Sequence, residues 1–109
     1  MKKYEIIKKN TDFNDIINTG RFFKNKYYSI YYKDDVEDFP RFGLAVSKKC
    51  GNAVRRNKVK RQLRMIVDKH KNLFKKKKRY IIMVRKVIID ISYQEMEANL
   101  VNLFLGKDK

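Results

Sequence analysis

The residues most able to do chemistry in this chain are cationic, and they gather at its centre. The segment 48–64, KKCGNAVRRNKVKRQLR, carries eight lysine or arginine side chains and no acidic one. These side chains bind phosphate oxygens, and arginine can do so through two parallel hydrogen bonds. A merely solvated helix surface is the alternative, but such surfaces usually mix both signs of charge. The segment therefore predicts a surface that binds a polyanion.

Helical spacing gives this segment two distinct faces. At 3.6 residues per turn, apolar side chains from Val59 to Val67 fall on one side. The opposite side carries Asn57, Arg61 and Arg64, and asparagine adds a directional donor and acceptor. Backbone amides at the start of the helix add partial positive charge that favours phosphate. We expect one face to pack and the other to bind.

The charge of the whole chain indicates the same class of partner. Its 28 Lys and Arg against 12 Asp and Glu give a formal net charge of +16 over 109 residues. Nucleic acid is the first candidate partner, and an anionic membrane surface is the alternative. No run approaches the ~18 apolar residues of a membrane-spanning helix, and the basic N-terminus lacks the apolar segment of a signal peptide. A cytoplasmic protein is therefore expected.

Residue types that support metal binding or nucleophilic catalysis are scarce. Cys50 is the only cysteine and His70 the only histidine, so no disulfide and no cysteine metal site is predicted. Both residues are expected to be structural. The carboxylates lie mostly in the connector 34–38, and no acid–base pair or metal cluster for phosphodiester hydrolysis is visible. We expect neither a catalytic residue nor a metal site on the protein.

Helices that would position the basic surface follow from caps and periodicity. Polar residues at 10–12, helically spaced apolar residues and Gly20 predict a short first helix. The basic segment predicts a helix over about 52–70. Ser92 and Glu95 form a capping box for a last helix.

Strands are predicted over 26–33, 41–47 and 79–84 from alternating or continuous apolar residues. The first two are expected to pair as a hairpin, and the third to be central because it is almost continuously apolar. The result is a single α+β domain over 1–109, a two-layer α/β sandwich with helices on one side of the sheet. Its order is helix, two or three strands, helix, strand, helix, in the fuller form α-β-β-β-α-β-α.

Tyrosines alternate along the strand 26–33. Tyr27, Ser29 and Tyr31 face one side, and Tyr28 and Tyr32 face the other. If helices cover one face only, the row that contains Ser29 stays open. Exposed aromatic rings among lysines can stack on unpaired bases of any sequence. That both rows belong to the core is equally compatible with the strand pattern.

At this point the residues resemble a known family, the protein subunit of bacterial ribonuclease P. The matching stretches are RFGLAVSKK at 41–49, GNAV at 51–54, RNKVKR at 56–61 and Arg64. Residues 8–13 and 80–86 also resemble the family, so the likeness covers most of the chain in the same order.

The resemblance implies a ribonucleoprotein endonuclease that removes the 5′ leader from precursor tRNA. Its active site would lie in a catalytic RNA, and Mg²⁺ would be held mainly by RNA. The partners would be that RNA and precursor tRNA, with no membrane and no small-molecule substrate. The implied fold is similar to the second domain of a small-subunit ribosomal protein. In it the basic helix joins two parallel strands by a left-handed crossover, against the usual rule.

Two sets of site residues follow from the resemblance by position. Those expected to contact the catalytic RNA are Lys48, Lys49, Asn52, Arg56, Asn57, Lys58, Lys60, Arg61 and Arg64. Those expected to line a cleft for the leader are Phe13, Ile17, Tyr27, Ser29 and Tyr31. Lys58 replaces the family's usual arginine and lacks its planar fork. Ile17 stands where an aromatic is frequent, so it offers apolar contact without stacking.

Two other function classes share part of this pattern. A ribosomal or general RNA-binding protein would have the basic helix and the α+β core but no preference for a 5′ leader. A protein-only metal nuclease would cut RNA unaided in magnesium, but would need the missing carboxylate or histidine cluster. The family resemblance instead predicts cleavage only when the catalytic RNA is present.

Overall fold

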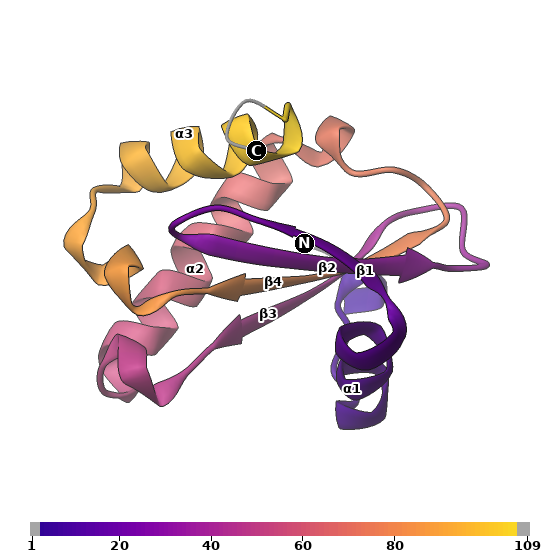
Figure 1. Ribbon diagram of the computed structural model, residues 1–109, viewed down its shortest axis with the longest axis horizontal. Helices are drawn as coiled ribbons and strands as arrows, with labels where there is room; N and C mark the ends of the chain where they lie inside the picture. The colour runs from indigo at the N-terminus through magenta and orange to yellow at the C-terminus, as the bar shows by residue number, and fades with distance from the viewer. Residues whose placement is uncertain (1–2, 107–109) are drawn as a thin grey trace.

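The helices and strands follow one another in the order α1-β1-β2-β3-α2-β4-α3, arranged around one sheet (Figure 1). The computed structural model describes residues 3–106. The elements are α1 (Asn10–Thr19), β1 (Arg21–Lys24), β2 (Tyr28–Asp34), β3 (Arg41–Val46), α2 (Ala53–Lys69), β4 (Lys78–Val84) and α3 (Tyr93–Phe104). This order confirms the α+β class and the predicted sequence α-β-β-β-α-β-α. Within 3–106, no helix has the length and apolar character to cross a membrane.

The sheet has the strand order β1-β2-β4-β3. β4 pairs antiparallel with β2 and parallel with β3, so Ile82 lies opposite both Ile30 and Leu44. The predicted hairpin between the strands at 26–33 and 41–47 is therefore wrong, because β4 lies between them. The central place predicted for β4 is confirmed, and its apolar residues continue on both faces as such a strand requires. α2 connects the parallel strands β3 and β4. That this crossover is left-handed remains a prediction.

Strand β1 is not apparent from the tyrosine-rich pattern. It begins directly after Gly20 and pairs antiparallel with β2. Gly20 permits this tight start, since a Cβ there would lie 2.4 Å from the carbonyl oxygen of Ile16. Asn25 Oδ1 closes the hairpin by accepting hydrogen bonds from the backbone amides of Tyr27 and Tyr28, both at 2.9 Å. As a result, β2 begins at Tyr28, later than predicted.

The starts of α2 and α3 are both capped, and the cap of α3 is the predicted capping box. Asn52 precedes α2, and its Oδ1 accepts a hydrogen bond from the backbone amide of Arg55 at 3.0 Å. At α3, Ser92 Oγ accepts from the amide of Glu95, and the Glu95 carboxylate accepts from the amide of Ser92, each at 3.2 Å. Both caps satisfy amides that a helix leaves free at its start.

α1 begins without the predicted cap. Its N-cap residue is Lys9, which makes no side-chain cap hydrogen bond, so capping by residues 10–12 is wrong. Those residues lie inside the first turn, where Asp12 approaches Nη1 of Arg79 at 3.9 Å instead. Gly20 follows the helix end as predicted.

Helices lie on both faces of the sheet (Figure 1). The larger core cluster joins Phe42 of the sheet to Leu63 of α2 and Leu100 of α3. A smaller cluster on the other face joins Ile16 of α1 to Ile81 of β4. The prediction that helices cover one side only is therefore wrong, because α1 packs across β2 and β4 on the opposite side.

The two residues predicted to be structural occupy packed positions. Cys50 is fully buried. His70 follows the end of α2, and its Nε2 lies 2.8 Å from Oε2 of Glu97 in α3. Hydrogen bonds from His70 and then Lys69 hold the pKa of Glu97 below its ordinary value. His70 therefore helps to join α2 to α3.

Candidate nucleic-acid interface

The outer face of α2 is free of core contacts. Val59, Leu63, Ile66 and Val67 are its buried residues, all on one side. The side chains of Asn57, Lys58, Arg61 and Arg64 are exposed, and those of Arg56 and Lys60 are half-buried. The assignment of the two faces is thus confirmed. RNA contact by these residues remains a prediction.

Arg56 has an unused donor at the edge of this face. Its Nε is buried and has no hydrogen-bond partner among the described residues. Buried donors are normally paired, so Nε would gain a partner only if the Arg56 side chain moved outward to meet a ligand.

The turn before α2 brings two more predicted residues to the surface. Lys48 and Lys49 are exposed in the 3₁₀ turn η2 (Lys48–Cys50), between β3 and α2. Gly51 follows with φ 115°, a backbone conformation that side chains disfavour, and an added Cβ would lie 2.8 Å from Cδ of Arg55. Asn52 is exposed too, but its Oδ1 already caps α2, which leaves its amide nitrogen for a partner.

Lys58 and Lys60 flank the exposed row on opposite sides. Lys58 lines a cavity of about 450 Å³ between α2 and the turn η4 (Lys86–Asp90). Lys60 and Arg64 line a groove of about 160 Å³ together with Lys8. The N-terminal segment reaches this groove because the amide of Ile7 donates to the carbonyl of Phe42 at 2.7 Å. Lys8 therefore extends the basic surface, which helical spacing within α2 could not reveal.

A second surface lies on the face of the sheet that α1 covers in part. Phe13 and Ile17 of α1 and Tyr31 of β2 are half-buried around the smaller core cluster. Gly43 admits the Phe13 ring, since a Cβ there would lie 2.6 Å from its Cζ. The structure therefore brings three of the five predicted leader-contacting residues together.

Tyr27 does not join this group, and Ser29 is buried on the face of β2 that carries Tyr31. Ser29 is 7% exposed, so the prediction that its row stays open is wrong at this position. Tyr27 precedes β2 and packs against the larger core cluster. The hairpin turn takes Tyr27 out of the strand, so simple alternation from Tyr31 misplaces its ring.

Phe22 is a residue that the sequence analysis missed. It lies opposite Tyr31 in the β1–β2 pair, the ring centroids are 5.6 Å apart, and its side chain is 58% exposed. An exposed aromatic beside Tyr31 adds a stacking surface. The strand pairing supplies this neighbour, and only recognition of β1 could have revealed it.

Ion pairs fix α1 against the sheet beside this surface. Lys33 Nζ lies 3.0 and 3.1 Å from the two carboxylate oxygens of Asp15 and 2.8 Å from Oγ1 of Thr19. Arg79 Nη2 approaches Asp15 at 3.6 Å. The hydrogen bond from Lys33 holds the pKa of Asp15 below its ordinary value. These contacts fix the position of α1, which forms one wall of this surface.

Comparison with known proteins identifies the family to which these surfaces belong. A family model described as Ribonuclease P matches residues 1–107. The chain belongs to the ribonuclease P protein family. It is 43% identical over 104 residues to the ribonuclease P protein component of Mycoplasma capricolum, covering 94% of this chain and 95% of that one. It is 42% identical over 105 residues to that of Bacillus velezensis, with 95% and 90% covered.

Solved structures of ribonuclease P proteins share the fold. The protein from Staphylococcus aureus superposes with a TM-score of 0.86 at 33% identity, covering 95% of this chain and 96% of that one. The protein from Thermotoga maritima gives 0.84 at 28% identity, with 92% and 94% covered. The family resemblance and the fold class are confirmed, and membership assigns this ribonuclease P protein to an endoribonuclease complex of tRNA processing.

Proposed function

We propose that this protein binds the catalytic RNA of ribonuclease P through the outer face of α2 and assists removal of the 5′ leader from precursor tRNA. One structural observation carries the proposal: α2 buries its apolar residues and leaves exposed a cationic row with no acidic residue before Asp68. Family membership names the complex in which such a surface would work.

The proposed contact for the leader is the surface formed by Phe13, Ile17, Tyr31 and Phe22. Rings and apolar side chains there could stack on or pack against unpaired bases without reading their sequence. Ion pairs at Asp15 hold the α1 wall in place. The protein would thereby keep the leader in register while the RNA carries out the cleavage.

The proposed chemistry belongs to the RNA partner. Phosphodiester cleavage with Mg²⁺ draws on charge neutralisation and an activated water. Over 3–106, no three His, Cys, Asp or Glu side chains are grouped so as to hold a metal ion. RNA oxygens would therefore supply most Mg²⁺ ligands, and the protein's cations would lower repulsion between leader, tRNA and catalytic RNA. The proposed compartment is the cytoplasm.

Cleavage of a 5′-labelled precursor tRNA at low magnesium concentration tests the proposal. The three reactions contain protein alone, a bacterial ribonuclease P RNA alone, and both together. Efficient cutting at the mature 5′ end in the combined reaction only is the expected result. No stimulation by the protein would reduce it to a general RNA-binding protein, and cutting by the protein alone would reveal a protein active site.

A further inference from the structure

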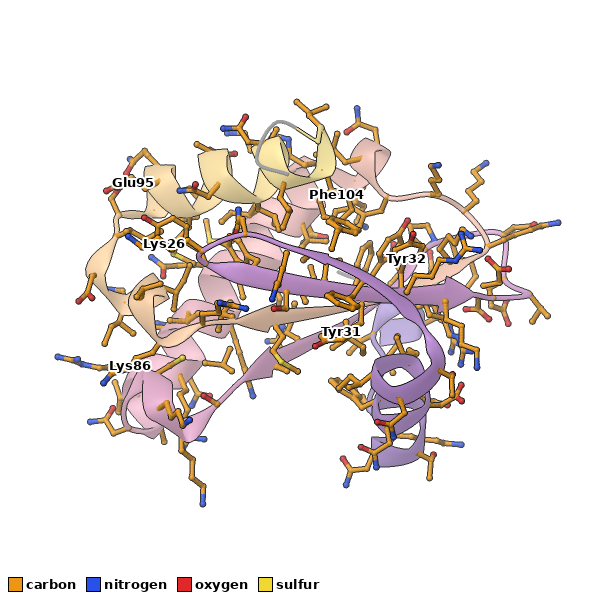
Figure 2. All side chains as sticks on the ribbon, in the orientation of Figure 1. Lys26, Tyr31, Tyr32, Lys86, Glu95 and Phe104 are labelled. Carbon is orange, nitrogen blue, oxygen red and sulfur yellow. The ribbon has the colours of Figure 1, made fainter. Side chains whose placement is uncertain are left out.

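An aromatic cavity lies on the opposite face of the sheet from the leader surface. It has a volume of about 310 Å³ and lies between the β1–β2 edge and the C-terminal end of α3. Phe23, Tyr32, Tyr80 and Phe104 contribute rings to its lining, with Phe23 centred 5.1 Å from Phe104 and 5.8 Å from Tyr32. Figure 2 shows Tyr32 and Phe104 on the α3 side of the sheet and Tyr31 on the α1 side. The volume is in the range of sites for small ligands.

The rim of this cavity is cationic. Arg21 and Lys75 are exposed there, and Lys78 Nζ lies 5.8 Å from the centroid of the Tyr32 ring. No acidic residue is among its lining residues; Asp34, which pairs with Lys78, lies outside the lining. An aromatic ring beside cations matches the two parts of a nucleotide, a base that stacks and a phosphate that carries charge.

The run of lysines at 75–78 is held in place beside the rings. The backbone amide of Lys75 donates to the hydroxyl of Tyr80 at 2.9 Å. The carbonyl of Lys77 accepts from the amide of Asp35 at 2.7 Å, and Lys77 has φ 61°. This run is separate from the basic surface of α2 and lies in a fixed position next to the aromatic cavity.

A neighbouring cavity connects this region to α1. It has a volume of about 180 Å³, is lined by Thr19, Lys33 and Asp34 among others, and shares Arg21, Tyr32 and Lys78 with the aromatic cavity. Thr19 is the last residue of α1, the helix that forms one wall of the leader surface. A polar path therefore runs from that wall, past the ends of β1, β2 and β4 at Arg21, Asp34 and Lys78, to the aromatic cavity.

We propose that the aromatic cavity binds leader nucleotides that lie upstream of those on the α1 face. The leader would pass around this end of the sheet, place a base among Tyr32, Phe23 and Phe104, and place phosphates at Arg21 and Lys75. This inference rests on the proposed function, because it requires that the leader first occupies the α1 face. The competing occupants are a single-stranded segment of the catalytic RNA, or none if the rings serve only to pack α3 on the sheet.

Varying the length of the leader distinguishes binding on the α1 face from binding in the aromatic cavity. Precursor tRNAs with leaders lengthened one nucleotide at a time are bound to the reconstituted complex of protein and catalytic RNA. Affinity should rise in two stages, first as the leader covers the α1 face and again, by about tenfold, when it reaches the aromatic cavity. A first stage without a second would overturn this inference alone. Loss of both stages would overturn the proposed function as well.

Charge-neutral variants test the location. Arg21→Gln with Lys75→Gln should abolish the second stage and leave the first intact. The matched control, Lys26→Gln with Lys86→Gln, removes the same charge from exposed residues and should keep both stages; Figure 2 shows both residues at the end of the molecule away from Tyr32. If both double variants lose the second stage equally, the effect comes from the overall charge of the protein, and the proposed site is overturned.

Photo-crosslinking identifies the occupant. With 4-thiouridine at successive leader positions, distal positions should crosslink to the α3 peptide that contains Phe104, which lines the cavity, and proximal ones to peptides of α1. Crosslinks to the Phe104 peptide from thiouridine in the catalytic RNA, with none from the leader, would assign the cavity to that RNA and contradict the proposal.

Discussion

Arg61 shows what a single exposed cation on α2 is expected to do. Its side chain is exposed and lies opposite the buried Leu63 side of the helix. Arg61→Ala should therefore weaken binding to the catalytic RNA without changing the unfolding midpoint. If Arg61 neutralises one phosphate, the slope of log affinity against log salt should fall by about 0.9. Titrations at several salt concentrations, with denaturant unfolding in parallel, measure both quantities.

The control for Arg61 lies on the same helix. Lys69 is in the last turn of α2 and pairs with Glu97 at 3.1 Å, so Lys69→Ala removes equal charge outside the cationic row. Its salt slope should match the wild type. Unfolding of the Arg61 variant would refute the face assignment, whereas an unchanged slope would remove Arg61 from the interface.

Substitutions of Tyr31 test whether its aromatic ring contacts the leader. Tyr31→Ala should reduce the preference of the complex for leader-bearing over mature tRNA, because a stacked base contributes about 1–3 kcal/mol. Tyr31→Phe keeps the ring and should keep the preference. Competition binding of the two RNAs gives the ratio directly. If the alanine variant discriminates as well as the wild type, Tyr31 does not contact the leader.

At the scale of elements, α1 is held to the sheet by charge as well as by its apolar side. Asp15→Asn should destabilise the protein at neutral pH, because it breaks the pair with Lys33. The pKa of Asp15 is lowered in the folded state, so its contribution is complete above the ordinary carboxyl pKa of about 3.9 and is lost as pH falls through the lower folded value. Wild type and variant should therefore converge in free energy of unfolding at low pH.

The matched control for this pH test is Asp38→Asn in the exposed connector between β2 and β3. It changes the net charge equally, so its difference from the wild type should stay small at every pH. If the free energies of unfolding of the wild type and Asp15→Asn differ as much in acid as at neutral pH, the carboxylate charge is not what stabilises α1.

The capping box of α3 gives a second element-scale prediction. Ser92→Ala removes the acceptor for the Glu95 amide and should lower the free energy of unfolding by about 1 kcal/mol. Ser47→Ala is the control, because Ser47 precedes the 3₁₀ turn η2 without a side-chain cap hydrogen bond. Urea denaturation of the three proteins compares the two serines; equal losses would mean that the cap contributes nothing specific.

Local patterns explain how far the sequence alone could predict these elements. The faces of α2 and the cap of α3 depend on neighbours within a turn or two, so periodicity reveals them. β2 and β3 each pair with β4 and not with each other, and β4 follows β3 only after thirty or so residues of connector and helix. Alternation also fails at Tyr27, where Asn25 turns the chain before β2 begins. Non-local contacts therefore account for the errors in both the fold and the leader surface.

For the whole molecule, the net charge of +16 means that the folded protein repels itself. A polyanion that binds the folded form should relieve this repulsion, and should stabilise it by about 2.7 kcal/mol at a ligand concentration of one hundred times Kd. Thermal unfolding with inorganic polyphosphate tests this expectation, with sodium chloride at equal ionic strength as the control. An equal rise of the unfolding temperature in both salts would indicate that the ions only screen the charge repulsion and that polyphosphate does not bind a specific surface.

The place of β4 between β2 and β3 also constrains the order in which this protein can be built during synthesis. Until Lys78–Val84 has left the ribosome, β2 and β3 each have an unpaired edge that no earlier part of the chain fills in the finished sheet. Unpaired strand edges invite association between chains. A nascent chain that stops after α2 would therefore lack its central strand, and folding is expected to be completed late and cooperatively once β4 inserts.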